Sequence, residues 1–110
     1  MGQNSQSVAY GFGQLGSAFT DTADNQLNPP TGKVFVAITF LEDTVFDSGS
    51  DGLVAETTQL FPDSTGTGTL IDADGGDVVD SETFPKGITI YGRWTGFKLS
   101  SGRVIAYLGV

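Results

Sequence analysis

Residues 33–41, with the sequence KVFVAITFL, decide the fold of this chain. After the lysine come eight uncharged residues in a row, and most of them are β-branched or aromatic. Such a run is too short for a typical helix, and side chains of this kind favour strands. A strand without a polar face needs cover on both sides. The sequence therefore predicts a strand over residues 33–41 that is buried on both faces.

Two further strands are predicted in the C-terminal third. The apolar positions that alternate with polar ones in the first of them are Ile88, Ile90 and Trp94. They should share one face, with Trp94 in the core. The alternation changes phase after Gly96, and a β-bulge at this glycine would return Phe97 and Leu99 to that face. Residues 100–102, Ser-Ser-Gly, predict a hairpin turn with glycine at the position of positive φ, followed by a returning strand over 104–108.

The middle of the chain is less regular. A second strand is expected over residues 53–61, between a polar turn region at 42–51 and Pro62. Residues 67–72 predict a short edge strand, and 72–82 an acidic loop. Five or more short strands and no helical pattern in 110 residues indicate one all-β domain, a small antiparallel β-sandwich or barrel, closed by the C-terminal strand.

The first 31 residues carry no strand or helix pattern and are rich in Gly, Gln, Asn and Ser. We expect an extended N-terminal arm over residues 1–31 and a single β domain over 32–110. A polar, Gly-rich segment has little reason to become ordered by itself, so apolar side chains should anchor it to the domain or to a neighbouring chain. The candidate anchors are Tyr10, Phe12, Leu15 and Phe19.

Residues 11–16, GFGQLG, match the G-x-G-x-x-G pattern of dinucleotide-binding loops. That pattern binds a pyrophosphate only between a strand and a helix, and neither is predicted around it. We therefore interpret the match as accidental and expect no cofactor.

Composition excludes most familiar catalytic chemistry. The chain has no Cys and no His, so it lacks thiolate chemistry and the commonest general base. A carboxylate pair that includes Glu42 or Glu56 could in principle hydrolyse a glycoside. With a single Trp for a sugar platform, solvated carboxylates are the simpler interpretation, and no enzymatic activity is expected. No apolar run of about 18 residues and no secretory signal are present, so a soluble chain that is made in the cytosol is expected.

Residues 72–82 resemble a calcium-binding loop, because hard cations need several oxygen ligands around a turn. The candidate ligands are Asp72, Asp74, Asp77 and Asp80. An EF-hand that begins at Asp72 would need Gly at its sixth position and Glu at its twelfth, where this chain has Asp77 and Thr83. A solvated acidic loop is therefore favoured, and a weak Ca²⁺ site is the alternative.

Charge is unevenly distributed along the chain. The net charge is −8, which argues against binding to nucleic acids or anionic membranes. No Lys or Arg lies between residues 34 and 85, whereas no acid follows residue 85. The C-terminal bases are Lys86, Arg93, Lys98 and Arg103. They could pair with the central acids inside the fold, which is the simpler interpretation, or dock on the acidic loops of another copy in a trimer or a ring on a shell.

Three segments together resemble small virion structural proteins of marine tailed phages, especially cyanophage-like ones. They are residues 29–41, 84–95 and 104–109, and the GQLG at 13–16 adds to the resemblance. The resemblance implies a phage particle component that is made in the host cytoplasm and ends in the virion. Its role would be that of a capsid decoration (cement) protein that binds the major capsid protein and copies of itself. A tail, neck or fibre component is an alternative, as is a calcium-dependent surface or carbohydrate adhesion module.

Overall fold

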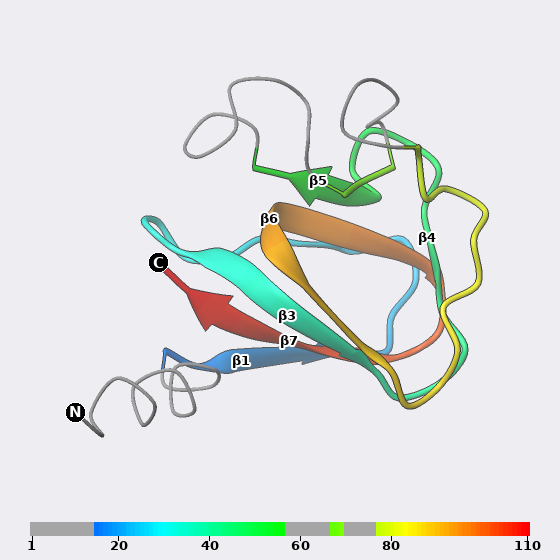
Figure 1. Ribbon diagram of the computed structural model, residues 1–110, viewed down its shortest axis with the longest axis horizontal. Coiled ribbons are helices and arrows are strands. Elements are labelled where there is room, and N and C mark those ends of the chain that lie inside the picture. Colours follow the sequence, from blue (N-terminus) through cyan, green and yellow to red (C-terminus); the bar gives the residue numbers. More distant parts are fainter. Residues whose placement is uncertain (1–14, 57–66, 70–76) are drawn as a thin grey trace.

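The computed structural model describes residues 15–56, 67–69 and 77–110, and in these ranges every regular element is a strand (Figure 1). All strand pairs are antiparallel, and the sheet is curled into a half-barrel. The predicted all-β, antiparallel class is confirmed. No helix in the described ranges has the length and apolar character that a membrane crossing needs. The strands are β1 (Ser17–Thr20), β2 (Gln26–Leu27), β3 (Val34–Phe40), β4 (Val45–Phe46), β5 (Leu53–Ala55), β6 (Thr89–Ser101) and β7 (Val104–Gly109).

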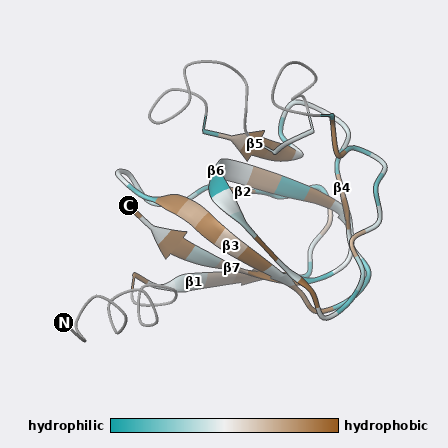
Figure 2. Cartoon of the chain, in the orientation of Figure 1, coloured by the Kyte–Doolittle hydropathy of each residue, from teal (hydrophilic) through white to brown (hydrophobic). Residues whose placement is uncertain are grey.

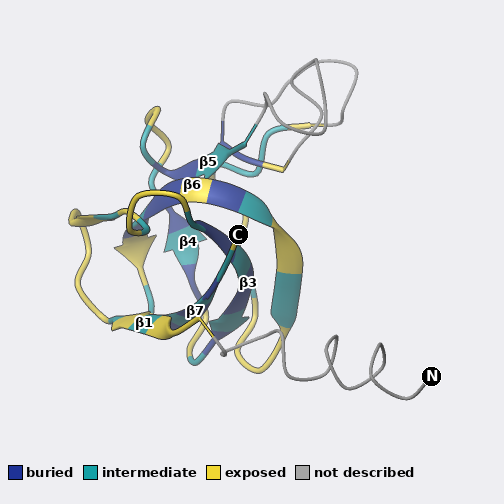
Figure 3. Ribbon diagram, turned by 90° about the vertical axis from the view of Figure 1, so that its left-hand side faces the viewer, coloured by how far each residue is buried: buried dark blue, intermediate teal, exposed yellow. Residues whose placement is uncertain are grey.

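Strand β3 is the centre of one layer, between β7 and the first half of β6. Five of its seven residues are buried, and the other two, Val36 and Thr39, are half-buried. Figure 2 shows it as one of the most hydrophobic strands, and Figure 3 shows how little of it reaches the surface. The expected strand, covered on both faces, is confirmed.

Strand β6 bends back on itself and belongs to both layers of the half-barrel (Figure 1). Its first half pairs with β3, and its second half pairs with β2, β4 and β5. The register against β5 skips Thr95, because Val54 lies opposite Gly96 and Ala55 opposite Trp94. A bulge is therefore present as expected, but it lies at Thr95 and not at Gly96, and it accompanies the bend between the layers.

The expected hairpin between the last two strands is wrong. In the sheet order of the described strands, β3 lies between β6 and β7. The bend carries the end of β6 into the second layer. The short connection that follows therefore links the two layers, and β6 and β7 do not pair with each other. Gly102 in this connection does have positive φ, at 107°, as expected.

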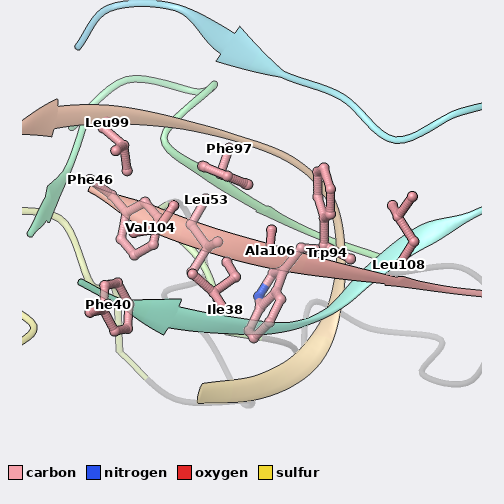
Figure 4. Close-up of a cluster of buried hydrophobic side chains, with 11 residues drawn as sticks. Ile38, Phe40, Phe46, Leu53, Trp94, Phe97, Leu99, Val104, Ala106 and Leu108 are labelled. Atoms are coloured by element: carbon pink, nitrogen blue, oxygen red, sulfur yellow. The ribbon is translucent and has the colours of Figure 1, made fainter. Parts of the chain in front are cut away.

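The core fills the space between the layers (Figure 4). Trp94 is buried, and its indole N–H donates a hydrogen bond to the Thr67 carbonyl oxygen at 2.8 Å. Phe35 from one layer meets Phe97 from the other edge-on, with ring centroids 5.2 Å apart. Trp94 is confirmed in the core, whereas Ile88 is 40% exposed because it precedes β6 at the rim, so its predicted place beside Trp94 is wrong.

The described part of the expected arm is not free of secondary structure. Strand β1 pairs with β7, and β2 pairs with the second half of β6. Residues 17–20 and 26–27 therefore contribute to the sheet, and residues 1–14 lie outside the described ranges. The expected strand over 53–61 is β5 at its start, and residues 57–61 are not described. Of the edge strand expected over 67–72, residues 67–69 are described and are not a strand, although Thr69 N–H donates to Leu53 O at 3.0 Å.

Candidate functional site

The outer face of the β1-β7-β3-β6 layer carries two rows of side chains that the strand register places side by side. One row runs from Ser17 through Tyr107 and Ala37 to Tyr91. The other runs from Phe19 through Ile105 and Thr39 to Thr89. None of these side chains is charged, so the face differs from the rest of this acidic chain.

A shallow cavity of about 290 Å³ lies at the end of the two rows that β6 forms, next to β3. It is lined by Ala37, Thr39, Thr89, Tyr91 and Tyr107. The two threonine hydroxyl oxygens lie 2.8 Å apart, within hydrogen-bond distance. Tyr91 is 66% exposed, so much of its side chain faces solvent. We call this cavity the tyrosine slot.

Of the predicted anchors, Phe19 belongs to β1, the outermost strand of this layer, and Leu15 lies just before that strand. Phe19 is 55% exposed and Leu15 is 40% exposed. Gly16, between them, accepts a backbone hydrogen bond from Leu108 at 2.9 Å, which holds the start of β1 on β7. This pairing also places the end of the G-x-G-x-x-G match against a strand and not at a helix start. Tyr10 and Phe12 lie outside the described residues.

Two of the four C-terminal bases form ion pairs within the fold, as the simpler interpretation of the charge pattern expects. Arg93 Nε lies 2.5 Å from Glu56 Oε1, and Arg103 NH2 lies 2.8 Å from Glu42 Oε1. Arg93 NH1 also donates to the Val110 carbonyl oxygen at 2.9 Å. The hydrogen bond that Arg93 donates to the Glu56 carboxylate raises the pKa of Arg93 above its usual value, against the opposing effect of burial.

Lys86 and Lys98 make no ion pair with any residue in the described ranges. The Lys86 backbone N–H donates to Asp43 Oδ1 at 3.0 Å, and its side chain is exposed. Docking through all four bases is therefore not available without breaking internal pairs. Of the four C-terminal bases, these two lysines remain for a partner, and that role stays a prediction.

The candidate metal ligands Asp77 and Asp80 form no cluster with other acidic residues that the structure describes. Across residues 15–56, 67–69 and 77–110, no three acidic side chains come together in a way that could hold an ion. Asp77 Oδ1 accepts a hydrogen bond from the Val78 N–H at 3.0 Å, within its own loop. Asp72 and Asp74 lie outside the described residues.

Sequence reasoning missed the tyrosine slot. The alternation in residues 104–108 indicates that Tyr107 points away from the core, and that signal was available. The sequence contained no sign that Tyr107 lies near Tyr91, because the expected hairpin left no place for β3 between the two strands.

Comparisons with protein-family models, with curated proteins and with solved structures found no match to this chain.

Proposed function

We propose that this chain is a structural protein of a phage particle, a capsid decoration protein that binds the major capsid protein and copies of itself. The assignment to a phage particle is supported by the resemblance of residues 29–41, 84–95 and 104–109 to small virion proteins of tailed phages. The exposed apolar side chains at the β1 edge support the mode of attachment, because a partner can cover them without disturbing the core.

The apolar anchors carry most of the binding in this proposal. Burying a Leu or Phe side chain fully contributes about 1.5–3 kcal/mol, and Leu15 and Phe19 keep roughly half of that available. A contribution of this size is weak for one copy, but attachment through several linked copies multiplies it by avidity. Screening shortens the reach of charges from about 10 Å at 0.1 M salt to about 3 Å at 1 M, so the lysines can set orientation but contribute less in salty water.

The experiment is to measure the copy number of this chain in purified particles, by quantitative mass spectrometry against the major capsid protein. A decoration protein is expected at a fixed ratio to the major capsid protein, in the capsid fraction after tails are sheared off. A few copies per particle that fractionate with tails would instead identify a tail, neck or fibre component. Recovery only as a free protein whose glycan binding is lost on calcium chelation would identify the adhesion module.

A further inference from the structure

Strand β1 has one edge that no other strand in the described ranges uses. It closes its layer on one side, with β7 as its neighbour (Figure 1). Leu108 N–H donates to Gly16 O at 2.9 Å, so the alternation of an antiparallel ladder turns the backbone groups of Ala18 toward β7 as well. The N–H and C=O groups of Ser17 and Phe19 therefore point away from the sheet, and both residues are exposed.

This edge lacks the features by which proteins usually protect an open strand. Charged side chains, proline and β-bulges are the common ones. Residues 17–20, Ser-Ala-Phe-Thr, include neither a charge nor a proline, and their register with β7 is regular. The strand at the other end of the sheet order, β2, differs, because Pro29 and Pro30 follow it closely. Strand β1 is thus the edge to which a further strand can be added.

We propose that β1 pairs antiparallel with β1 of a second copy of this chain, about a two-fold axis at Ala18. Ser17 of each copy then lies opposite Phe19 of the other, and all the outward N–H and C=O groups of these two residues form hydrogen bonds across the axis. Neighbouring registers would bring Leu15 or Asp21, which lie outside the strand, into the pair. The proposal rests on the part of the proposed function in which copies bind one another, and it names the contact.

The net charge of −8 does not oppose this contact, because the surface around it is neutral. No residue of β1, β7 or β3 is charged. Asp21 follows β1 directly, and its two copies would lie at opposite ends of the pair, about 20 Å apart along the strands. Repulsion between them is screened, because the Debye length is about 10 Å at 0.1 M salt.

Pairing also covers an exposed aromatic side chain. Phe19 is 55% exposed and lies beside Ile105 on the outer face of its own sheet. In the pair, the two Phe19 residues are diagonal neighbours, about 7–8 Å apart, which is within reach of aromatic rings. The contact is small, so we expect weak association of free chains and firm association only where several contacts act together.

The absence of cysteine from the sequence allows a test that reads the register directly. Ala18→Cys places two thiols opposite each other on the axis, with Cα atoms about 4.5 Å apart, within the range of a disulfide. Thr20→Cys is the matched control, since both residues are half-buried in β1 and the two copies of residue 20 would lie about 14 Å apart. During mild oxidation of the full chain, Ala18→Cys should form a covalent dimer at least about tenfold faster than Thr20→Cys. Equal rates, or no dimer from Ala18→Cys, would overturn the pairing.

Sedimentation of the full chain tests association without a crosslink. A species of twice the chain's mass is expected to grow toward millimolar concentration. Ser17→Pro removes an N–H from the open edge and none from the ladder with β7, so it should weaken the dimer about tenfold or more. Ser17→Ala keeps this N–H and should associate like the wild type. Phe19→Ser, which changes an exposed side chain, should also weaken the dimer.

Blue-shifted fluorescence of the buried Trp94 reports that each variant is folded. If Ser17→Pro does not fold, Phe19→Ser and the cysteine pair decide the question. A wild-type chain that stays monomeric would show that this edge is covered within the chain or not used, and it would leave attachment to a capsid, which the copy number tests, standing. That result, a dimer that persists in folded Ser17→Pro, or assembly that continues beyond two copies would overturn the proposal.

Discussion

The backbone of Gly102 lies directly against Thr44, so close that a Cβ atom at position 102 would overlap both the side chain and the Cα of Thr44. Thr44 is fully buried, and its hydroxyl donates to the Glu42 carbonyl oxygen at 2.8 Å. The positive φ of Gly102 is a second constraint at the same residue. The connection that joins the two layers thus depends on the absence of a side chain.

Gly102→Ala should therefore destabilise the domain more than a glycine substitution that adds strain alone. Gly87 is the matched control, since it has φ of 93° and open space around its Cβ position. We expect Gly87→Ala to cost about 1–2 kcal/mol from backbone strain. Gly102→Ala adds overlap with Thr44 and should cost about 2–5 kcal/mol. Urea denaturation of both variants measures the difference, and equal costs would show that Thr44 yields to the added methyl group.

Trp94→Ala should remove both packing and a hydrogen bond. The side chain is 1% exposed, so we expect a cost of about 3–5 kcal/mol, enough to unfold a domain of this size. Trp94→Phe keeps much of the ring and loses the bond to the Thr67 carbonyl, and should be milder. Denaturant titration gives the two costs, and the wild-type Trp fluorescence should be blue-shifted and resistant to quenching. Red-shifted, readily quenched emission would contradict the buried position.

The two ion pairs should contribute unequally to stability. The side chains of Arg93 and Glu56 are 28% and 13% exposed, whereas those of Arg103 and Glu42 are 46% and 51% exposed. Glu56→Gln should cost about 1–2 kcal/mol, because a charged hydrogen bond is lost in a half-buried place. Glu42→Gln should cost at most about 0.5 kcal/mol, as surface pairs do. Thermal melts of both variants at low and high salt test this order, and a larger loss at Glu42 would reverse it.

Attachment to a particle should depend on the β1 anchors more than on the lysines. Leu15→Ser/Phe19→Ser alters exposed side chains, so the domain should fold normally but detach at high salt. Lys86→Glu/Lys98→Glu changes the two C-terminal bases that form no ion pair in the described part of the chain, and this variant should remain bound at high salt. Sedimentation of particles with each variant measures the bound fraction. Release by the charge reversal, together with retention of the serine variant, would reverse this ranking of the two effects.

The strength of a local pattern determined which elements could be predicted from the sequence. Residues 33–41 are uniformly apolar and predict β3 without any knowledge of its partners. The phase change at Gly96 likewise locates the irregularity in β6. By contrast, residues 17–20 form β1 because β7 offers an open edge, and the outward Phe19 breaks any apolar pattern that could have indicated a strand.

Pairing between strands was less predictable than the strands themselves. A glycine turn between two apolar strands normally indicates a hairpin, and Gly102 has the expected backbone geometry. The bend at Thr95 overrides that signal, because it moves the end of β6 away from β7. The tyrosine slot depends on this same arrangement, so its lining residues could be predicted to face outward but not to lie together.

Strands β6 and β7 also determine when this domain can fold. Each pairing among the seven described strands includes one of these two, which begin only at residues 89 and 104. A growing chain on the ribosome therefore cannot form any of this sheet until residues from 89 onward have been made. Folding should wait until these residues have left the ribosome, and the dominance of contacts distant in sequence makes it slow compared with a helical domain of equal size. Until then the apolar strand β3 lacks both of its pairing partners, β6 and β7. The chain is most prone to aggregate during this interval.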